Sequence, residues 1–587
     1  MTYNWDLSHI YKSEDEYNSD LEKIQEYTIK LKTYEGRLEN LDVLIEFLTL
    51  KDQARRVSSK LWVYASLSKD LDLSDPKSAE RMAVLSDILS KLNDSYSFFL
   101  PELLTFSGEK FRQILRDDRF SSYKRFFERL IEKKLHILSK EEEALLSKLG
   151  FLFGAPYDLY NSVKMVDIKY PTIHSPEGEE VKITFGTYNL ARTHKDRDYR
   201  RRAFDALYGT LYNYKNTLGK TLYYEVQKNA RLAQIRKFDS ALDSALFNFE
   251  IPRKVYDNLL CGTIESLPAL HKYIFLRKKA LNLDKVTPYD LAVPLSFEDK
   301  KYTYEECCNL ALKYLSILGE EYITVIKKAV TGGWIDVYEA PHKAPGGYQS
   351  GCFDTHPYIL LNFDNTFNSL STLVHELGHA LHAYFCNNYC DYPNHSVSAF
   401  CAEIASITNE ILLIKGLIKD SKDDDEKLYY LNKYADLLRN TAYSQMLYAD
   451  FEKQIHEKVE SGLALSAQSL GEIWANLNQK YYGPGFENPF YNKVGWAYIL
   501  HFYLNFYTFN YALSICAANK AANNILNGDV EGYINFLKSG GKLSPVESVK
   551  QLGIDMADKN VVLDLYRDFE NTINEIEEIL NRKGDLD

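Results

Sequence analysis

The stretch 373–382 constrains this chain more than any other, because it contains His375, Glu376 and His379 in the order H-E-x-x-H. In an α-helix, residues four apart lie on one face, about one turn from each other. Two imidazoles placed in this way can bind a single Zn²⁺ ion. Glu376 follows the first imidazole directly, where a general base for a zinc-bound water has to lie. We therefore expect one Zn²⁺ per chain.

The residues around this motif favour a buried helix over a chance match. Tyr358–Phe363 is a short apolar run that predicts a strand, and 365–372 offers several residues that can cap a helix. Apolar residues then recur through 372–386, the predicted zinc helix. The alternative is a core helix whose two histidines bind no metal, and the strand, cap and helix in sequence argue against it.

A catalytic zinc ion needs a third protein ligand and an open position. The extended pattern H-E-x-x-H-x-x-G-x-x-H is absent, since Phe385 stands where its last histidine would be. His382 lies roughly 10 Å beyond His375 along the helix axis, at about 1.5 Å per residue, so we expect it behind the ligands or in the wall of a cleft. Glu403 is on a second predicted helix, 398–418. A buried carboxylate is costly unless it is paired or bound to a metal, so Glu403 is the expected third ligand.

Glu410 lies two turns beyond Glu403 on the same predicted helix. There it can accept a hydrogen bond from one of the ligand histidines and fix the orientation of that ring. An acidic residue on a solvated helix face is an equally good interpretation of the sequence at this position.

These residues, taken together, resemble those of a known family. His375–His379, followed by Ala402–Ser406 and by Asn409 and Glu410, resembles the oligoendopeptidase F group of the thimet-oligopeptidase-like zinc peptidases. Further likenesses span essentially the whole chain and lie at 4–7, 345–349, 357–362, 501–503, 535–541 and 552–555.

The resemblance implies a mainly α fold: a large, multi-helix, two-lobed zincin with a deep central channel and a small β-sheet next to the zinc helix. It also implies an enzyme that cuts short peptides at internal bonds. His501 and Tyr507 are then expected to hold the oxyanion, with Tyr503 as a further substrate-binding residue. Phe509 stands where the family pattern predicts a tyrosine, which leaves the choice of hydroxyl open.

Two more expectations concern the substrate. Gly347 and Tyr348, in a Pro/Gly-rich loop, are candidate substrate-binding residues at the rim of the site, and an ordinary connecting loop is an equally good interpretation of this segment. We expect the strand that precedes the zinc helix to be an edge strand, to which an extended peptide can add by main-chain hydrogen bonds. In the C-terminal part, Tyr503, Tyr507 and Tyr511 recur every four residues, which predicts one face of a helix. For each of these tyrosines, packing in the core is as good an interpretation as contact with a substrate.

Composition excludes several other classes of protein. The 587 residues carry a formal net charge of −12, which argues against nucleic acid as a partner. No apolar run approaches the ~20 residues of a membrane span, and the first residues lack a secretory signal. The eight cysteines are scattered, so we interpret them as reduced thiols and expect a cytoplasmic protein. The sequence gives no oligomeric state.

We expect two regions along the chain. Residues 1–195 predict an N-terminal helical lobe with a β-hairpin near 163–185, its strands at Val163–Tyr170 and Glu180–Phe185. Residues 196–587 form the expected catalytic region. Two other functions stay open: a carboxypeptidase-type exopeptidase of similar fold, and a non-catalytic peptide-binding protein. The second has no need of a general base, so Glu376 argues against it.

Overall fold

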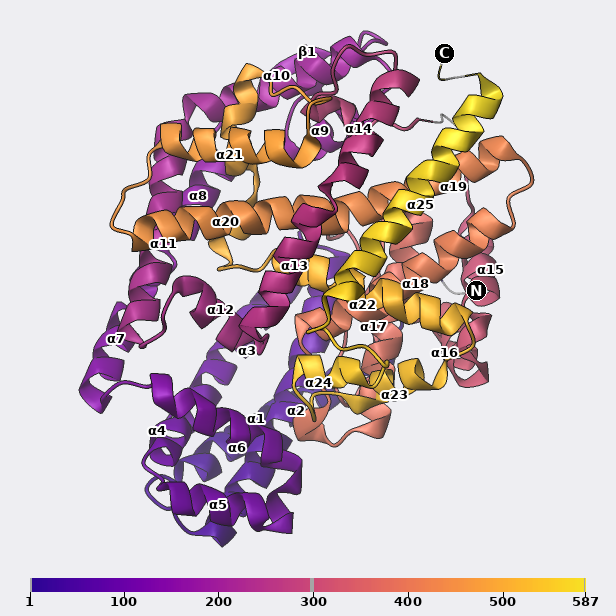
Figure 1. The fold of residues 1–587 in the computed structure, drawn as a ribbon. Coiled ribbons are helices and arrows are strands. Elements are labelled where there is room, and N and C mark those ends of the chain that lie inside the picture. The colour runs from indigo at the N-terminus through magenta and orange to yellow at the C-terminus, as the bar shows by residue number, and fades with distance from the viewer. Residues whose placement is uncertain (1–2, 296–299, 585, 587) are drawn as a thin grey trace. The chain divides into compact units, whose positions relative to one another are not determined.

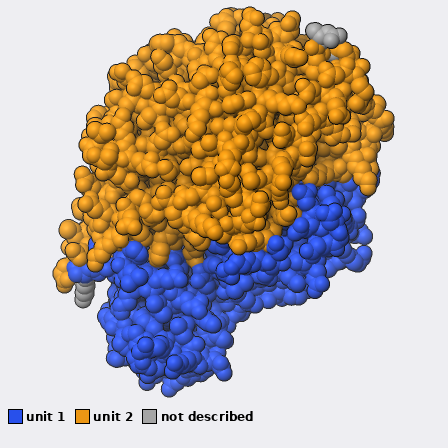
Figure 2. All heavy atoms as spheres, in the orientation of Figure 1, with its two compact units in different colours: residues 1–140, 300–413, 521–553 blue, residues 141–299, 414–520, 554–587 orange. Residues whose placement is uncertain are grey.

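The computed structural model describes residues 3–295, 300–584 and 586. Helices make up most of these residues and the strands are few and short, which confirms the mainly α fold (Figure 1). The chain forms two compact units, each assembled from three separate stretches (Figure 2). Unit 1 comprises 1–140, 300–413 and 521–553, and unit 2 comprises 141–299, 414–520 and 554–587. A functional division at residue 195 stays a prediction.

Unit 1 contains the N-terminal helices, a small sheet and the helix with the H-E-x-x-H motif. Its helices include α1 (Glu14–Lys32), α2 (Leu41–Leu71), α3 (Pro76–Ser95), α4 (Phe99–Leu104), α5 (Gly108–Arg116), α6 (Lys124–Lys133), α15 (Tyr304–Tyr314), α16 (Glu320–Thr331), α17 (Phe367–Tyr389), α23 (Glu531–Ser539) and α24 (Pro545–Lys550). The helix α18 (Ala399–Lys419) begins in this unit and ends in unit 2.

The sheet of unit 1 has three strands in the order β3 (Ile335–Asp336), β5 (Tyr358–Leu360), β4 (Tyr348–Ser350). β3 runs parallel to β5, and β4 runs antiparallel to it. The strand before α17 is therefore central, and our expectation of an edge strand there was wrong. All three residues of β5 are buried, which suits a strand with a partner on each side, whereas β4 is half-buried at the edge.

One hydrophobic core joins the N-terminal helices to this sheet. α1 begins at the cap Ser13, whose side chain accepts a hydrogen bond from the Glu16 amide, with three acidic residues in the first turn. Leu31 and Leu44 of the first two helices are fully buried, and the same core includes Tyr358 and Leu360 of the central strand. The helices thus support the strands that lie next to the motif.

The start of α17 is fixed by hydroxyl and carboxylate groups. Thr366 caps the helix by accepting a hydrogen bond from the Ser369 amide. Asp364 accepts hydrogen bonds from the hydroxyls of Thr366 and Ser369, each at 2.6 Å. The cap lies within the predicted stretch 365–372, and the helix begins at Phe367, about one turn before the predicted start.

Unit 2 is also mainly helical. Its elements are α7 (Lys140–Phe153), α8 (Ala155–Ser162), β1 (Thr172–His174), β2 (Glu180–Lys182), α9 (Phe185–Ala191), α10 (Arg197–Asn213), α11 (Lys215–Ile235), α12 (Ala241–Phe249), α13 (Arg253–Glu265), α14 (Leu267–Ala280), α19 (Asp424–Leu438), α20 (Ser444–Glu460), α21 (Ala467–Tyr482), most of α22 (Phe509–Leu526) and α25 (Lys559–Lys583). Among the described residues, no helix is both long enough and apolar enough to cross a membrane.

The hairpin of unit 2 is present, but its first strand is not where the sequence predicted it. β1 and β2 pair antiparallel, with Thr172 opposite Lys182. Val163–Asp167, predicted as a strand, is instead a π-helical turn that extends α8. The Lys164 ammonium lies 3.8 Å from the centre of the Phe185 ring and 2.8 Å from the Tyr160 hydroxyl. These tertiary contacts outweigh the local β-propensity of the valine-rich segment.

Candidate metal centre

Three side chains of unit 1 converge on one point. The Nε2 atoms of His375 and His379, both on α17, lie 3.1 Å apart. Glu403 Oε2, from α18, lies 3.6 Å from the first of these nitrogens and 3.8 Å from the second. One donor atom from each residue lies within 4.8 Å of the other two, so the three side chains together could hold one metal ion.

Gly378 makes this convergence possible. An added Cβ at Gly378 would lie 2.5 Å from Cα of Ser406 and 2.7 Å from the carbonyl oxygen of Ala405, both on α18. Only a residue without a Cβ lets the two helix backbones approach this closely. Gly378 was not predicted from the sequence in this role, although a glycine inside a buried helix is a signal for close packing.

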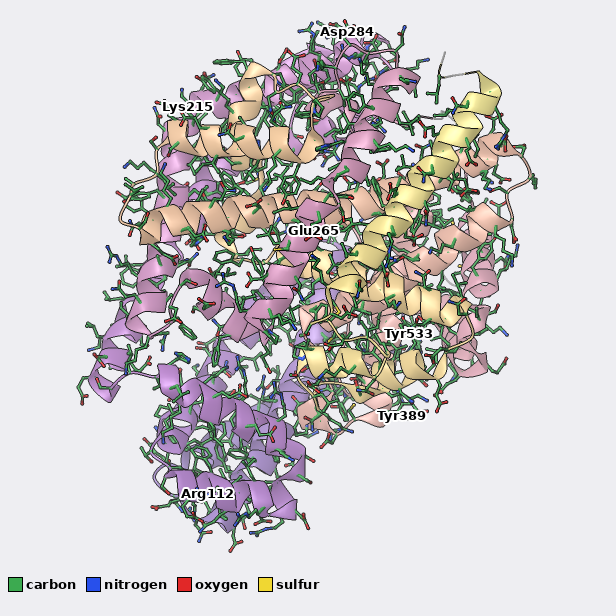
Figure 3. The ribbon with its side chains drawn as sticks, viewed as in Figure 1. Arg112, Lys215, Glu265, Asp284, Tyr389 and Tyr533 are labelled. Carbon is green, nitrogen blue, oxygen red and sulfur yellow. The ribbon has the colours of Figure 1, made fainter. Side chains whose placement is uncertain are left out.

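Buried polar groups hold the helices around the motif in place. The Asn409 side chain on α18 donates to the Val374 carbonyl on α17 at 3.3 Å, and it accepts from the Tyr322 hydroxyl at 2.9 Å. Tyr533, labelled in Figure 3, lies on α23, and its hydroxyl donates a hydrogen bond to the Ala405 carbonyl at 3.3 Å. The helices α16, α17 and α23 are thus tied to α18 within the two turns that follow Glu403.

A second carboxylate orients the first histidine. His375 donates from Nδ1 to Glu410 Oε1 at 2.7 Å, which leaves Nε2 facing the other donors. The Ser371 hydroxyl, one turn earlier on α17, donates to Glu410 Oε2 at 2.6 Å. Burial lowers the pKa of His375, but the Glu410 and Glu403 carboxylates outweigh it and raise that pKa to about 9. Ser371 was not among the residues predicted from the sequence.

Glu376 lies beside the three candidate metal ligands, His375, His379 and Glu403, but is not one of them. Its side chain is buried, and Oε2 has no hydrogen-bond partner among the described residues. Burial raises the pKa of Glu376 to about 7, the His375 ring opposes that rise, and the Glu403 and Glu410 carboxylates add to it. A carboxyl group in this state can both take and give a proton near neutral pH.

The other candidates in unit 1 have different surroundings. His382 is buried on α17 and lines a cavity beside His379. A Cβ at Gly347 would lie 2.8 Å from the Thr372 side chain, so this glycine lets the start of β4 approach α17. The Tyr348 hydroxyl donates to Asp70 at 2.5 Å and its ring packs against the N-terminal core. Contact of Gly347 or Tyr348 with a substrate would therefore be through the backbone.

The aromatic candidates lie in unit 2, and the predicted helix through them was wrong. His501 and Tyr503 belong to a short 3-10 helix, and α22 starts only at Phe509. Between them, Asn505 and Phe506 have φ values of 46° and 59°. Two successive left-handed residues cannot continue an α-helix, so Tyr503, Tyr507 and Tyr511 do not share one helical face.

The structure distinguishes the two candidate tyrosines. The Tyr503 hydroxyl lies 2.7 Å from that of Thr221, and the buried ring stacks on Tyr160 at 4.5 Å between centroids. His501 and Tyr507 are only half-buried, and their rings stack at 6.1 Å. Tyr503 is thus buried within unit 2, whereas the Tyr507 ring is partly exposed, and a contact of Tyr507 with a substrate stays a prediction.

Comparison with known proteins shows the family of this chain. The model of Peptidase family M3 matches residues 190–567, and the model described as Oligopeptidase F matches residues 102–170. The chain is 36% identical to Oligopeptidase PepF of Bacillus subtilis, over 98% of this chain and 87% of that protein. It is 37% identical to an Oligoendopeptidase F homolog of Lactococcus lactis, over 98% and 97%.

The solved structures agree as well. The crystal structure of oligoendopeptidase-F from Enterococcus faecium superimposes with a TM-score of 0.76 at 30% identity, and it covers 97% of this chain and 99% of its own. The resemblance to the oligoendopeptidase F group is therefore confirmed. With a family model over most of its length and relatives that match from end to end, this chain belongs to peptidase family M3 and is a peptidase of the oligoendopeptidase F group.

Proposed function

We propose that the chain is a zinc-dependent endopeptidase that hydrolyses internal bonds of short peptides. The observation that carries this proposal is the convergence of His375, His379 and Glu403, with an unpartnered oxygen of Glu376 beside them. Two imidazoles and one carboxylate, with a further position open, are the donor set of catalytic zinc sites. Zinc held there would polarise the scissile carbonyl and make a water molecule more acidic.

The residues of the chain then account for the proton transfers. Glu376 takes a proton from the attacking water and passes it to the leaving amine, which its pKa of about 7 permits in both directions. Glu410 accepts the Nδ1 hydrogen of His375, so Nε2 is the nitrogen that would lose its proton on binding the metal. His501 and Tyr507 are the proposed hydrogen-bond donors to the oxyanion, each worth about 2.7–4 kcal/mol in such sites.

The proposed substrates are short peptides. The names of the relatives from Bacillus subtilis and Lactococcus lactis refer to oligopeptides, and β4 offers an edge to which an extended main chain can hydrogen-bond. A carboxypeptidase would need a cation for the terminal carboxylate, and the described residues that line the cavity beside His379 include no lysine or arginine. All eight cysteines are free, which fits the cytoplasm as the proposed location.

The substitution Glu376→Gln tests the proposal. The variant should keep one zinc ion per chain while kcat falls by about 10²–10⁴-fold, because only the general base is lost. Zinc is measured by atomic emission and kcat with an internally quenched peptide. The control is Glu321→Gln, a salt-bridged glutamate on the surface of the same unit, which should leave both values unchanged. Near-normal turnover of Glu376→Gln would reject the assignment.

A further inference from the structure

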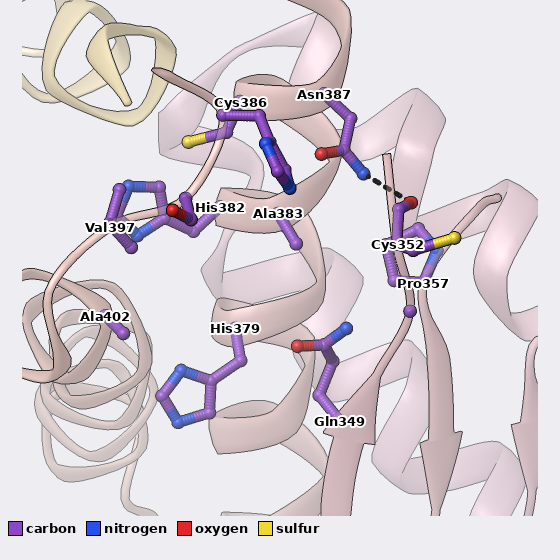
Figure 4. Close-up of a pocket in the computed structure, with 13 residues that line it drawn as sticks. Gln349, Cys352, Pro357, His379, His382, Ala383, Cys386, Asn387, Val397 and Ala402 are labelled. Carbon is purple, nitrogen blue, oxygen red and sulfur yellow. Dashed lines mark hydrogen bonds between the residues drawn. The ribbon is translucent and has the colours of Figure 1, made fainter. Parts of the chain in front are cut away.

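A cavity of about 190 Å³ lies beside His379 within unit 1. One wall is β4 with the loop that follows it, the second is α17, and the third is the segment 395–397 with the start of α18 (Figure 4). An engineered protein cavity of about 150 Å³ accommodates a benzene molecule, so this one is large enough for an aliphatic or aromatic side chain.

The cavity is continuous with the metal donors. His379 lines it, and so does Ala402, the residue before Glu403. The cavity also borders Gln349 of β4 and Gly351, the residue after it. β4 is an edge strand of the sheet. Consider a peptide main chain that pairs with β4 and places its scissile carbonyl at the proposed metal ligands. The cavity then lies next to one of the two residues that flank the scissile bond.

The lining determines which side chains can enter. It contains no aspartate, glutamate, lysine or arginine among the described residues. Its apolar side chains are those of Cys352, Pro357, Ala383, Cys386, Val397 and Ala402, and Gln349, Asn387 and Ser396 add polar groups without charge. Burial lowers the pKa of His382 to about 4, so this ring carries no charge near neutral pH. A charged side chain would lose its hydration there without a counter-charge, whereas an apolar one would be stabilised by burial.

We propose that this cavity binds one uncharged side chain of the substrate, from a residue directly next to the bond that is cut. The inference rests on the proposed endopeptidase function and adds a specificity pocket to it. Ala383 and Val397 both line the cavity, so substitutions at these two positions can change its size and its charge.

Filling the cavity tests its size. In Ala383→Leu, kcat/KM should fall about tenfold or more for peptides with leucine or phenylalanine at one flanking position, because the pocket is shortened by several carbon atoms. Peptides with glycine at that position should be cut as before. The matched control is Asn388→Leu, on an exposed position of the same helix, which should leave the whole profile unchanged.

Adding a charge tests the selectivity. In Val397→Asp, the ratio of kcat/KM for lysine over leucine at the same position should rise at least tenfold, since the new carboxylate offers a counter-charge. Zinc content and circular dichroism establish that each variant is folded. If the wild type cuts glycine-flanked peptides but neither variant changes the profile, the pocket is rejected and the endopeptidase stands. If the wild type with bound zinc cuts no peptide, the proposed function itself fails.

Discussion

Burial raises the pKa of two glutamates in this chain, Glu376 and Glu452, which lie in different surroundings. Glu376 lies beside the proposed metal ligands, whereas Glu452 lies on α20 of unit 2 and is fully buried. Glu452 Oε1 accepts a hydrogen bond from the Phe506 amide at 2.6 Å, and Oε2 has no partner among the residues described. Desolvation raises the pKa of Glu452 to about 8. Its hydrogen bond supports the left-handed backbone before Tyr507.

The raised pKa predicts a pH-dependent stability. Glu452 is protonated in both states below about pH 4.5, where its contribution is fully present. Between about pH 4.5 and 8 only the unfolded chain releases the proton, so stability falls as pH rises. In Glu452→Gln, the midpoint of thermal unfolding should therefore drop less between pH 5.5 and 8.5 than in the wild type. Glu457→Gln, on the exposed part of the same helix, is the control. Equal drops in all three proteins would contradict the prediction.

At the scale of residues, the sequence revealed the groups that lie on one helix or carry a charge that needs a partner. His375 and His379 follow from helical spacing, and Glu403 from its cost in an apolar face. Ser371 could not be found in this way. Its role depends on how α18 lies against α17, which brings Glu410 to the Ser371 hydroxyl, and no local pattern encodes that contact.

At the scale of elements, the approach of α17 and α18 decides whether the donors meet. In Gly378→Ala, better helix propensity should add at most about 1 kcal/mol of stability. The new Cβ, however, would press on the Ser406 and Ala405 backbone, and overpacking of this kind typically costs about 1–3 kcal/mol. We therefore expect a lower unfolding midpoint and weaker zinc binding, measured by thermal unfolding and chelator competition.

Gly150 provides the matched control for this substitution. It lies in α7, and an added Cβ there would meet no atom within 4 Å. Gly150→Ala should therefore raise the unfolding midpoint through helix propensity alone and leave zinc affinity unchanged. If both variants were stabilised and bound zinc like the wild type, the close approach at Gly378 would not matter for the site.

Elements that follow from one periodicity were predictable, and those that depend on partners elsewhere in the chain were not. The zinc helix and the N-terminal helices follow from apolar spacing and caps. The tyrosine spacing at 503–511 suggested a helix, but the left-handed Asn505 and Phe506, supported by distant Glu452, interrupt it. The order of the strands likewise depends on pairing between distant segments, which made β5 central.

At the scale of the whole molecule, each proposed metal ligand belongs to the same compact unit. His375, His379 and Glu403 all lie in unit 1, although the donors come from two different helices. A metal ion that binds the folded donors and not the unfolded chain stabilises the fold by mass action. That stabilisation should be largest in α17 and α18, the helices that carry the proposed metal ligands.

Removal of zinc should therefore change unit 1 locally. At a free zinc concentration 1,000 times the dissociation constant, the stabilisation amounts to about 4.1 kcal/mol. After chelation, amide hydrogen exchange should become faster in α17 and in the first part of α18, while α10 and α13 of unit 2 keep their rates. In Glu403→Ala the same treatment should produce little change, because one donor is already missing. Equal changes in both units, or an undiminished response in Glu403→Ala, would show that the metal binds elsewhere.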